Sequence, residues 1–173
     1  MNIFATSECP TQSALNLDDL RLRKMIIESA QILSTAIYLR TRSLSDLLYR
    51  PTHKGHPCVR WAYRSRDNFL WLYRHGLSMA VIHRDISGVE HASEKILHEA
   101  HKSWHLFSNQ GLTEFENCTT YKDGYEHVPI FDKYRLQMID KWNSDLRSPK
   151  WTRRQIPDWY TKQRKQDDQQ IDR

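Results

Sequence analysis

The pattern of apolar and polar positions along the chain predicts a mainly helical protein. Between residues 18 and 40, apolar side chains recur every three or four positions, which is the spacing of one face of an α-helix. Asp18 or Asp19 stands at the start of this run and can cap the free N–H groups of the first turn. Comparable patterns predict three further helices, over about residues 59–86, 93–107 and 132–146.

Prolines, glycines and polar residues mark where the helical pattern stops. The expected interruptions are an extended lead-in over residues 1–16, a loop over residues 49–57 and an irregular segment over residues 108–130. The chain has only five glycines and six prolines, which are too few turn-forming residues for a many-stranded β fold. We therefore expect a compact single-domain helical bundle over residues 1–160, with long irregular loops, followed by a polar and frayed C-terminal tail over residues 161–173.

Composition supports one folded domain and narrows the choice of partner only slightly. The 173 residues include 39% hydrophobic and 27% charged residues, a balance typical of globular proteins. No apolar run approaches the roughly 18 residues of a membrane span, and the N-terminus lacks the pattern of a secretory signal. The net charge of +5 slightly favours a polyanionic partner.

The three cysteines do not suggest a disulfide framework. Cys9, Cys58 and Cys118 are odd in number and far apart in the sequence. We expect all three to be small buried residues in a reducing compartment.

The first predicted long helix carries a core face and, next to it, a narrow polar stripe. Successive stripe positions are three or four residues apart, so each lies one turn above the last. Apolar residues border the stripe on both sides, and Ser34 is expected to face open water. The core face is formed by Leu22, Ile26, Ser29, Ala30, Leu33 and Ile37, and the stripe by Arg21, Lys24, Glu28, Gln31 and Thr35.

A polar stripe between apolar shoulders is typical of the floor of a cleft. A carboxylate such as Glu28, flanked there by Arg21 and Lys24, would have its charge stabilised and its position fixed. The alternative is a solvated helix face laced by salt bridges. The sequence alone leaves both interpretations open.

Histidines and the C-terminal aromatic residues offer other possible sites. His98, His101 and His105 share one face of a predicted helix and could ligate a metal, although no His-Glu-x-x-His pattern accompanies them, which favours surface or hydrogen-bonded histidines. The stretch 147–160 mixes cations with aromatic rings, which can neutralise phosphates and stack on bases exposed from a duplex. Alternatively, its aromatic residues pack this segment onto the core.

The run over residues 17–31 resembles a group of small phage and bacterial proteins. Its helix has the form Leu-Asp-x-x-Arg-Leu-x-Lys followed by Glu and Gln, and the later Lys54-Gly55-His56-Pro57 and residues 68–72 have counterparts in that group. More distantly, the chain resembles the phage pyrimidine-dimer DNA glycosylases (endonuclease V), whose Pro-x-Trp-Tyr is similar to residues 157–160. That family implies a compact, all-helical enzyme that flips a base, cuts the glycosidic bond and cleaves the strand by β-elimination.

The resemblance implies a catalytic role for Glu28, which falls at the place of the family's catalytic glutamate, while Arg21 occupies the position of a DNA-contacting residue. The family attacks with an N-terminal amine exposed on a small second residue after methionine removal. Here Asn2 follows Met1, and excision before a residue of that size is generally poor. The nucleophile is therefore the Met1 amine, Lys24 or neither.

The polar stripe and the family resemblance together favour a DNA-acting enzyme of the base-excision type, an N-glycosylase and/or abasic-site lyase, in the cytoplasm (the host cytoplasm if phage-encoded). The partner is duplex DNA with an extruded base, or a free nucleotide, and no membrane, metal or organic cofactor is needed. The alternative is a non-catalytic, phage-encoded protein that binds a nucleotide or a host protein. Glu28 and Lys24 are the catalytic candidates, and the substrate-binding candidates are Arg21, Gln31, His53, His56, Trp159 and Tyr160.

Overall fold

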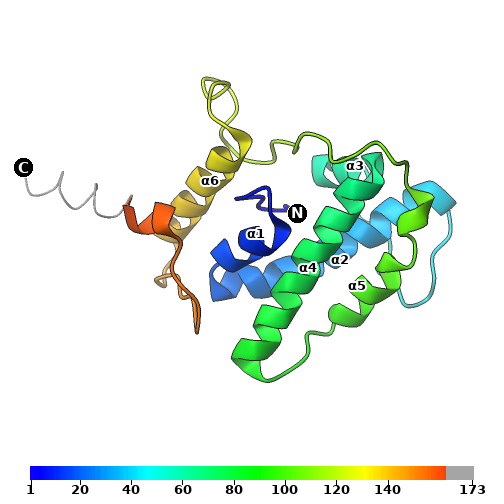
Figure 1. Ribbon diagram of the computed structural model, residues 1–173, viewed down its shortest axis with the longest axis horizontal. Helices are drawn as coiled ribbons and strands as arrows, with labels where there is room; N and C mark the ends of the chain where they lie inside the picture. The colour runs from blue at the N-terminus through cyan, green and yellow to red at the C-terminus, as the bar shows by residue number, and fades with distance from the viewer. Residues whose placement is uncertain (163–173) are drawn as a thin grey trace, which may run out of the picture.

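The computed structural model describes residues 1–162, and every regular element within that range is a helix (Figure 1). The predicted mainly α fold is therefore confirmed, while residues 163–173 of the expected tail lie outside the described residues. None of the helices in residues 1–162 is long and apolar enough to cross a membrane. The elements are α1 (Pro10–Asn16), α2 (Asp19–Thr41), α3 (Pro57–Arg64), α4 (Arg66–Ser87), α5 (Glu94–His101), the 3-10 helix η1 (Trp104–Leu106) and α6 (Ile130–Ser144).

Helices α2 and α4 form the centre of the molecule (Figure 1). Both contact α3 and α5, and α4 also packs against α1. Gly76 lies on α4 where it approaches its neighbours: a Cβ atom at this position would be 3.0 Å from Leu97 Cδ2 and 3.1 Å from Ser29 Cβ. A glycine at this crossing therefore allows α4 to approach both α2 and α5 closely.

Helix α2 agrees with its prediction except at Ser34. It starts after Asp18 and ends at Arg42, whose left-handed backbone (φ 58°) stops the helix. The predicted core-face residues are buried. Ser34 is also fully buried, contrary to the expectation, because the chain after α2 folds back over it: its hydroxyl donates to Ala30 O (2.7 Å) and accepts from Tyr49 N (3.2 Å).

The single helix expected over residues 59–86 is in fact two helices, separated at Ser65. The backbone of Ser65 is extended (φ −142°, ψ 160°), which ends α3. Its hydroxyl accepts from Asn68 N (3.1 Å) and donates to Gly111 O (2.7 Å). The side chain therefore caps α4 and anchors a distant loop at the same time.

Three other boundaries differ from the prediction. The lead-in contains the seven-residue helix α1, which starts at Pro10, a residue suited to the first turn of a helix. The helix expected over residues 93–107 ends at His101 and is followed by the separate η1. Helix α6 starts directly after Pro129 and ends at Ser144, two residues earlier at each end than the expected helix over residues 132–146. The segment between η1 and α6 is irregular, as expected.

Residues 1–9 run between α6 and the α2–α4 pair (Figure 1). From α6, Arg135 Nε donates to Thr6 O (3.0 Å), and from α4, Trp71 Nε1 donates to Glu8 O (2.6 Å). These bonds join segments that are distant in sequence and fix the path of the N-terminal segment. Its first residues consequently reach the middle of α2.

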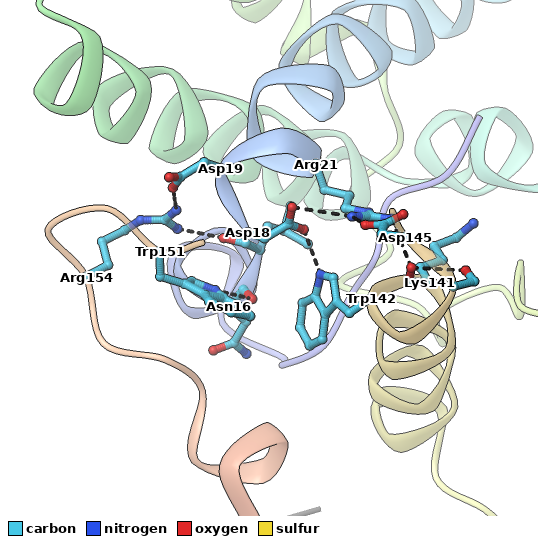
Figure 2. Close-up of polar contacts among 11 residues, drawn as sticks. Asn16, Asp18, Asp19, Arg21, Lys141, Trp142, Asp145, Trp151 and Arg154 are labelled. Atoms are coloured by element: carbon cyan, nitrogen blue, oxygen red, sulfur yellow. Dashed lines mark hydrogen bonds and ion pairs between the residues drawn. The ribbon is translucent and has the colours of Figure 1, made fainter. Parts of the chain in front are cut away.

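The chain after α6 is fastened to the start of α2 by a set of polar contacts that we call the α2 junction (Figure 2). Trp142 Nε1 donates to Asp18 Oδ1 (2.8 Å). Arg154 Nη1 donates to Leu17 O (2.7 Å), and its Nη2 donates to Asp19 Oδ1 (2.5 Å). These largely buried polar groups are hydrogen-bond partners of one another, so the contact joins the chain after α6 to the start of α2.

Candidate active site

The carboxylate of Glu28 meets the nitrogen atoms at the start of the chain. The amine nitrogen of Met1 is 3.7 Å from Glu28 Oε2, and Asn2 N donates to the same oxygen (2.8 Å). On the other side, Lys24 Nζ is 3.6 Å from Glu28 Oε1. The Glu28 side chain is only 14% exposed, so the carboxylate is held among nitrogen donors in a largely enclosed place.

The side chain of Asn2 holds the first residues in position. Its Nδ2 donates to Cys118 O (3.1 Å), while its Oδ1 accepts from Ile3 N (2.7 Å) and Phe4 N (3.0 Å). Phe4 adopts a left-handed backbone (φ 40°), which turns the chain away after this contact. The amine is thereby fixed next to α2.

A hollow of about 320 Å³ opens at this point, and we call it the Glu28 hollow. Its second half comes from residues that the sequence does not mark as site candidates: Cys118 is expected only as a small buried residue, and the others carry no motif. No local signal could have found them, because they follow Glu28 by 90 residues or more in the sequence. Two lysine ammonium groups, the amine and one carboxylate gather there, a set that suits an anionic substrate. The lining residues are Met1, Asn2, Phe4, Lys24, Glu28, Cys118, Thr120, Gln137 and Lys141.

Within the polar stripe of α2, Lys24 and Glu28 line the Glu28 hollow, Gln31 is half-buried, and the two ends are tied to other parts of the chain. At one end, Arg21 pairs with Asp145 and Asp18 (Figure 2), and its guanidinium holds the pKa of the Asp145 carboxyl below its ordinary value. At the other end, the Thr35 hydroxyl donates to the loop at Thr52 O (3.2 Å). Arg21 therefore braces α6 against α2 and does not contact Glu28.

The two loop histidines differ in their surroundings. His56 caps α3, with its Nδ1 accepting from Cys58 N (3.2 Å). Burial lowers the pKa of His56, and the Met1 amine and His53 shift it in the same direction, while Glu28 opposes them. His53 is exposed, with its Nδ1 2.7 Å from Thr52 Oγ1. His56 thus lies within electrostatic reach of the amine and of Glu28.

Two of the three cysteines lie side by side next to this site. Cys58 Sγ donates to Cys118 Sγ at 3.0 Å. This hydrogen bond and burial raise the pKa of Cys58, whereas the same hydrogen bond lowers the pKa of Cys118. The expectation that all three cysteines are buried is confirmed only for Cys58. Cys118 is half-buried, and Cys9 is exposed because it lies in the surface turn before α1.

The C-terminal aromatic residues pack together away from the Glu28 hollow. Trp159 stacks on Trp142 with ring centroids 5.4 Å apart, and Tyr160 is 5% exposed among Trp142 and Trp151. Trp159 also lines a separate hollow of about 630 Å³. That hollow is larger; of the arginines that line it, Arg154 is bound to backbone carbonyls and to a carboxylate, whereas Arg153 is exposed.

The histidines of α5 and η1 are engaged in ordinary packing contacts. The His101 ring stacks on Tyr73 with centroids 4.2 Å apart, and His98 Nδ1 is 3.3 Å from the Tyr73 hydroxyl. Among the described residues, these histidines do not form a group of three close metal-binding side chains. The stacked and hydrogen-bonded interpretation therefore accounts for them.

Comparison with known proteins confirms the family resemblance. The family model described as pyrimidine dimer DNA glycosylase matches residues 1–85. The match contains Lys24, Glu28 and His56 and stops near the end of α4, before the residues that complete the Glu28 hollow. No curated protein and no solved structure matches the chain.

Proposed function

We propose that this chain is a DNA base-excision enzyme, an N-glycosylase and/or abasic-site lyase, whose reaction centre pairs Glu28 with the amine at the start of the chain. The observation that carries the proposal is the Met1 amine, 3.7 Å from Glu28 Oε2 at the edge of a solvent-open hollow. The match of residues 1–85 to the pyrimidine dimer DNA glycosylase family supports the same chemistry.

The proposed reaction uses the amine as a nucleophile. The neutral amine nitrogen bonds to C1′ of the deoxyribose as the C1′–N glycosidic bond breaks, and the base leaves with the bonding electrons. The attacking nitrogen gives one proton to Glu28, and the ring oxygen O4′ takes a proton back as its bond to C1′ breaks, so the sugar opens to a protonated imine. Removal of a C2′ proton then expels the 3′ phosphate by β-elimination. Glu28 would accept and return protons and stabilise the cationic sugar.

The position of the nucleophile does not depend on removal of the first methionine. If Met1 is kept, its amine is 3.7 Å from Glu28 Oε2; if Met1 is removed, the amine of Asn2 is left at the atom that already lies 2.8 Å away. Asn2 therefore need not be small for an amine to reach the carboxylate. Lys24 is 71% exposed and so lacks the desolvation that activates lysine nucleophiles, which makes phosphate binding its better role.

The surroundings provide groups for binding a DNA backbone. Lys24 and Lys141 line the Glu28 hollow and can neutralise phosphates beside an extruded nucleotide. His56 and Gln31 would border the hollow, and His53 would contact the strand from the neighbouring loop. Trp159 remains a candidate for a more distant DNA contact at the larger hollow, and Tyr160 for one at a neighbouring hollow of about 330 Å³. Arg21 would act indirectly, by holding α6 against α2.

A borohydride trapping assay tests the nucleophile directly. The full-length protein is mixed with duplex DNA carrying a single abasic site, reduced, digested and mapped by mass spectrometry. We expect a covalent adduct on the N-terminal peptide, retained in Lys24→Gln and lost when the amine is acetylated. An adduct on Lys24 would move the nucleophile to that residue. No adduct and no strand cleavage would favour the non-catalytic alternative, a protein that binds a nucleotide or a host protein.

Replacing Glu28 by Gln separates catalysis from binding. The amide keeps the size of the side chain but cannot take up a proton, so cleavage of the abasic duplex should fall by roughly 10²–10⁴-fold. DNA binding, measured by fluorescence anisotropy, should change little. Glu90→Gln on the exposed surface is the matched control and should cleave at the wild-type rate. Normal cleavage by Glu28→Gln would remove Glu28 from the mechanism.

A further inference from the structure

We infer that His56, Cys58 and Cys118 bind a thiophilic metal ion, Zn²⁺, next to the proposed reaction centre. The two sulfur atoms and a ring nitrogen of His56 all lie within 4.8 Å of one another. Within residues 1–162, these side chains are the group of three whose donor atoms come together in this way. The proposal concerns metal binding by the free protein, so it does not depend on the DNA chemistry proposed above.

The donor set and its dimensions suit zinc. Two thiolates and one imidazole are typical zinc ligands, with bond lengths that place neighbouring tetrahedral ligands about 3.5–3.8 Å apart. The Sγ atoms of Cys58 and Cys118 are 3.0 Å apart and would need to separate by less than 1 Å. Three protein ligands leave a fourth position for water or another donor.

The backbone holds these three residues close together before any ion binds. His56 and Cys58 flank Pro57 at the start of α3, where His56 Nδ1 accepts from Cys58 N in the metal-free protein. Because a neutral imidazole has only one acceptor nitrogen, ligation by either ring nitrogen replaces this hydrogen bond. Cys118 is fixed from α6, because the Tyr134 hydroxyl accepts from Cys118 N (3.4 Å) and donates to Glu116 O (2.7 Å). The start of α3 and the Tyr134 contact fix the backbone of the site, so the reorganisation on metal binding is confined to the His56 ring and the two thiols.

Zinc would also change the neighbourhood of the N-terminus. Cys118 O accepts the Asn2 side-chain N–H that orients the first residues toward Glu28. An ion joining Cys118 to α3 would therefore brace Asn2 through one hydrogen bond. A bound divalent ion would in addition balance the negative charge of two adjacent thiolates.

Cobalt titration of the reduced protein under anaerobic conditions is the test. Co²⁺ bound by thiolates gives sulfur-to-metal charge-transfer and tetrahedral d–d absorption, which should saturate at one equivalent per chain and vanish when Zn²⁺ is added. Cys58→Ser and Cys118→Ser should abolish the charge-transfer band or reduce it by half or more, and His56→Asn should change the d–d spectrum. Cys9→Ser is the matched control, because Cys9 is exposed and lies outside the group; it should titrate like the wild type.

Two results would overturn the proposal. The first is a wild-type protein, folded by circular dichroism, that shows no thiolate–cobalt absorption with both thiols reduced. The second is a charge-transfer band that keeps its full wild-type intensity in Cys58→Ser or Cys118→Ser, or that disappears in Cys9→Ser. The wild-type titration stands even if a cysteine variant fails to fold, and His56→Asn keeps a residue able to cap α3. Neither result bears on base excision, because no DNA is present.

Discussion

His75 lies completely buried in the helical core, where its Nδ1 is 3.0 Å from Pro10 O and its ring stacks on Trp71. Burial lowers the pKa of His75 from 6.5 to about 4. In the unfolded chain, His75 therefore binds a proton below about pH 6.5, whereas in the folded protein it binds one only below about pH 4. The stabilisation by neutral His75 is present above the unfolded pKa and is lost as the pH falls through this window.

Urea unfolding at about pH 7 and pH 5 should reveal this loss. His75 alone is expected to lower the free energy of unfolding by about 2 kcal/mol between these two conditions. His75→Gln should show a correspondingly weaker dependence on pH, whatever its overall stability. The exposed His127→Gln is the control and should keep the wild-type dependence. Equal pH dependence in all three proteins would show that His75 does not stay neutral in the folded state.

At the same scale, the sequence predicts single residues only where local spacing carries the signal. Glu28 stands out because apolar shoulders flank its stripe, and the structure places it at an amine and a hollow. The partner of Arg21, by contrast, is Asp145, which is 124 residues away in the sequence. The contact between Cys58 and Cys118 spans 60 residues. No periodicity along one helix contains information about such pairs.

The elements meet most tightly where α4 crosses its neighbours at Gly76. A side chain there would press on Leu97 of α5 and on Ser29 of α2, both within 3.1 Å of the position of a Cβ atom. A protein core tolerates such overpacking poorly, because neighbouring helices must shift as rigid bodies.

Gly76→Val should therefore lower the free energy of unfolding by about 1–3 kcal/mol. The same substitution at Gly55, where a Cβ would meet nothing within 4 Å, is the control and should change stability by less than about 0.5 kcal/mol. Thermal and urea unfolding of both variants would measure the difference. A Gly76→Val protein as stable as the wild type would mean that the α4 crossing is loosely packed.

The predictability of each helix follows from its length and from how it ends. Helix α2 was predicted almost to the residue because 23 residues repeat one apolar pattern. Helix α1, with seven residues, is too short for a period to stand out. The break between α3 and α4 was missed because it depends on one serine hydroxyl and not on a glycine or a proline. Side-chain capping of this kind becomes visible only when the partner atoms are in place.

For the molecule as a whole, the α2 junction decides how the second half of the chain is held. Arg154 lies at its centre, with a side chain only 7% exposed and bonds to Leu15 O, Leu17 O and Asp19. The adjacent Arg153 is exposed, and its side chain donates one hydrogen bond, to Asp85 O. The two neighbouring arginines thus offer a matched comparison of a structural and a surface cation.

Arg154→Ala should lower the free energy of unfolding by about 2–3 kcal/mol, because it removes the charge partner of Asp19 and the side-chain donor to Leu15 O and Leu17 O. Arg153→Ala should cost less than about 0.5 kcal/mol. Hydrogen exchange followed by mass spectrometry should also show faster exchange in α6 and residues 145–160 for Arg154→Ala only. Identical exchange in the two variants would indicate that the aromatic cluster holds this half without the arginine.

The Glu28 hollow is built from both halves of the chain, since its amine and carboxylate come from residues 1–28 and its remaining wall from residues 118–141. The family match covers only the first of these groups. Mutation and selection can therefore act on them separately over evolutionary time. Substitutions over residues 118–141 would change the shape and charge of the hollow without moving the amine or the carboxylate. Selectivity and reactivity at this hollow are therefore set by separate segments and can be altered one at a time.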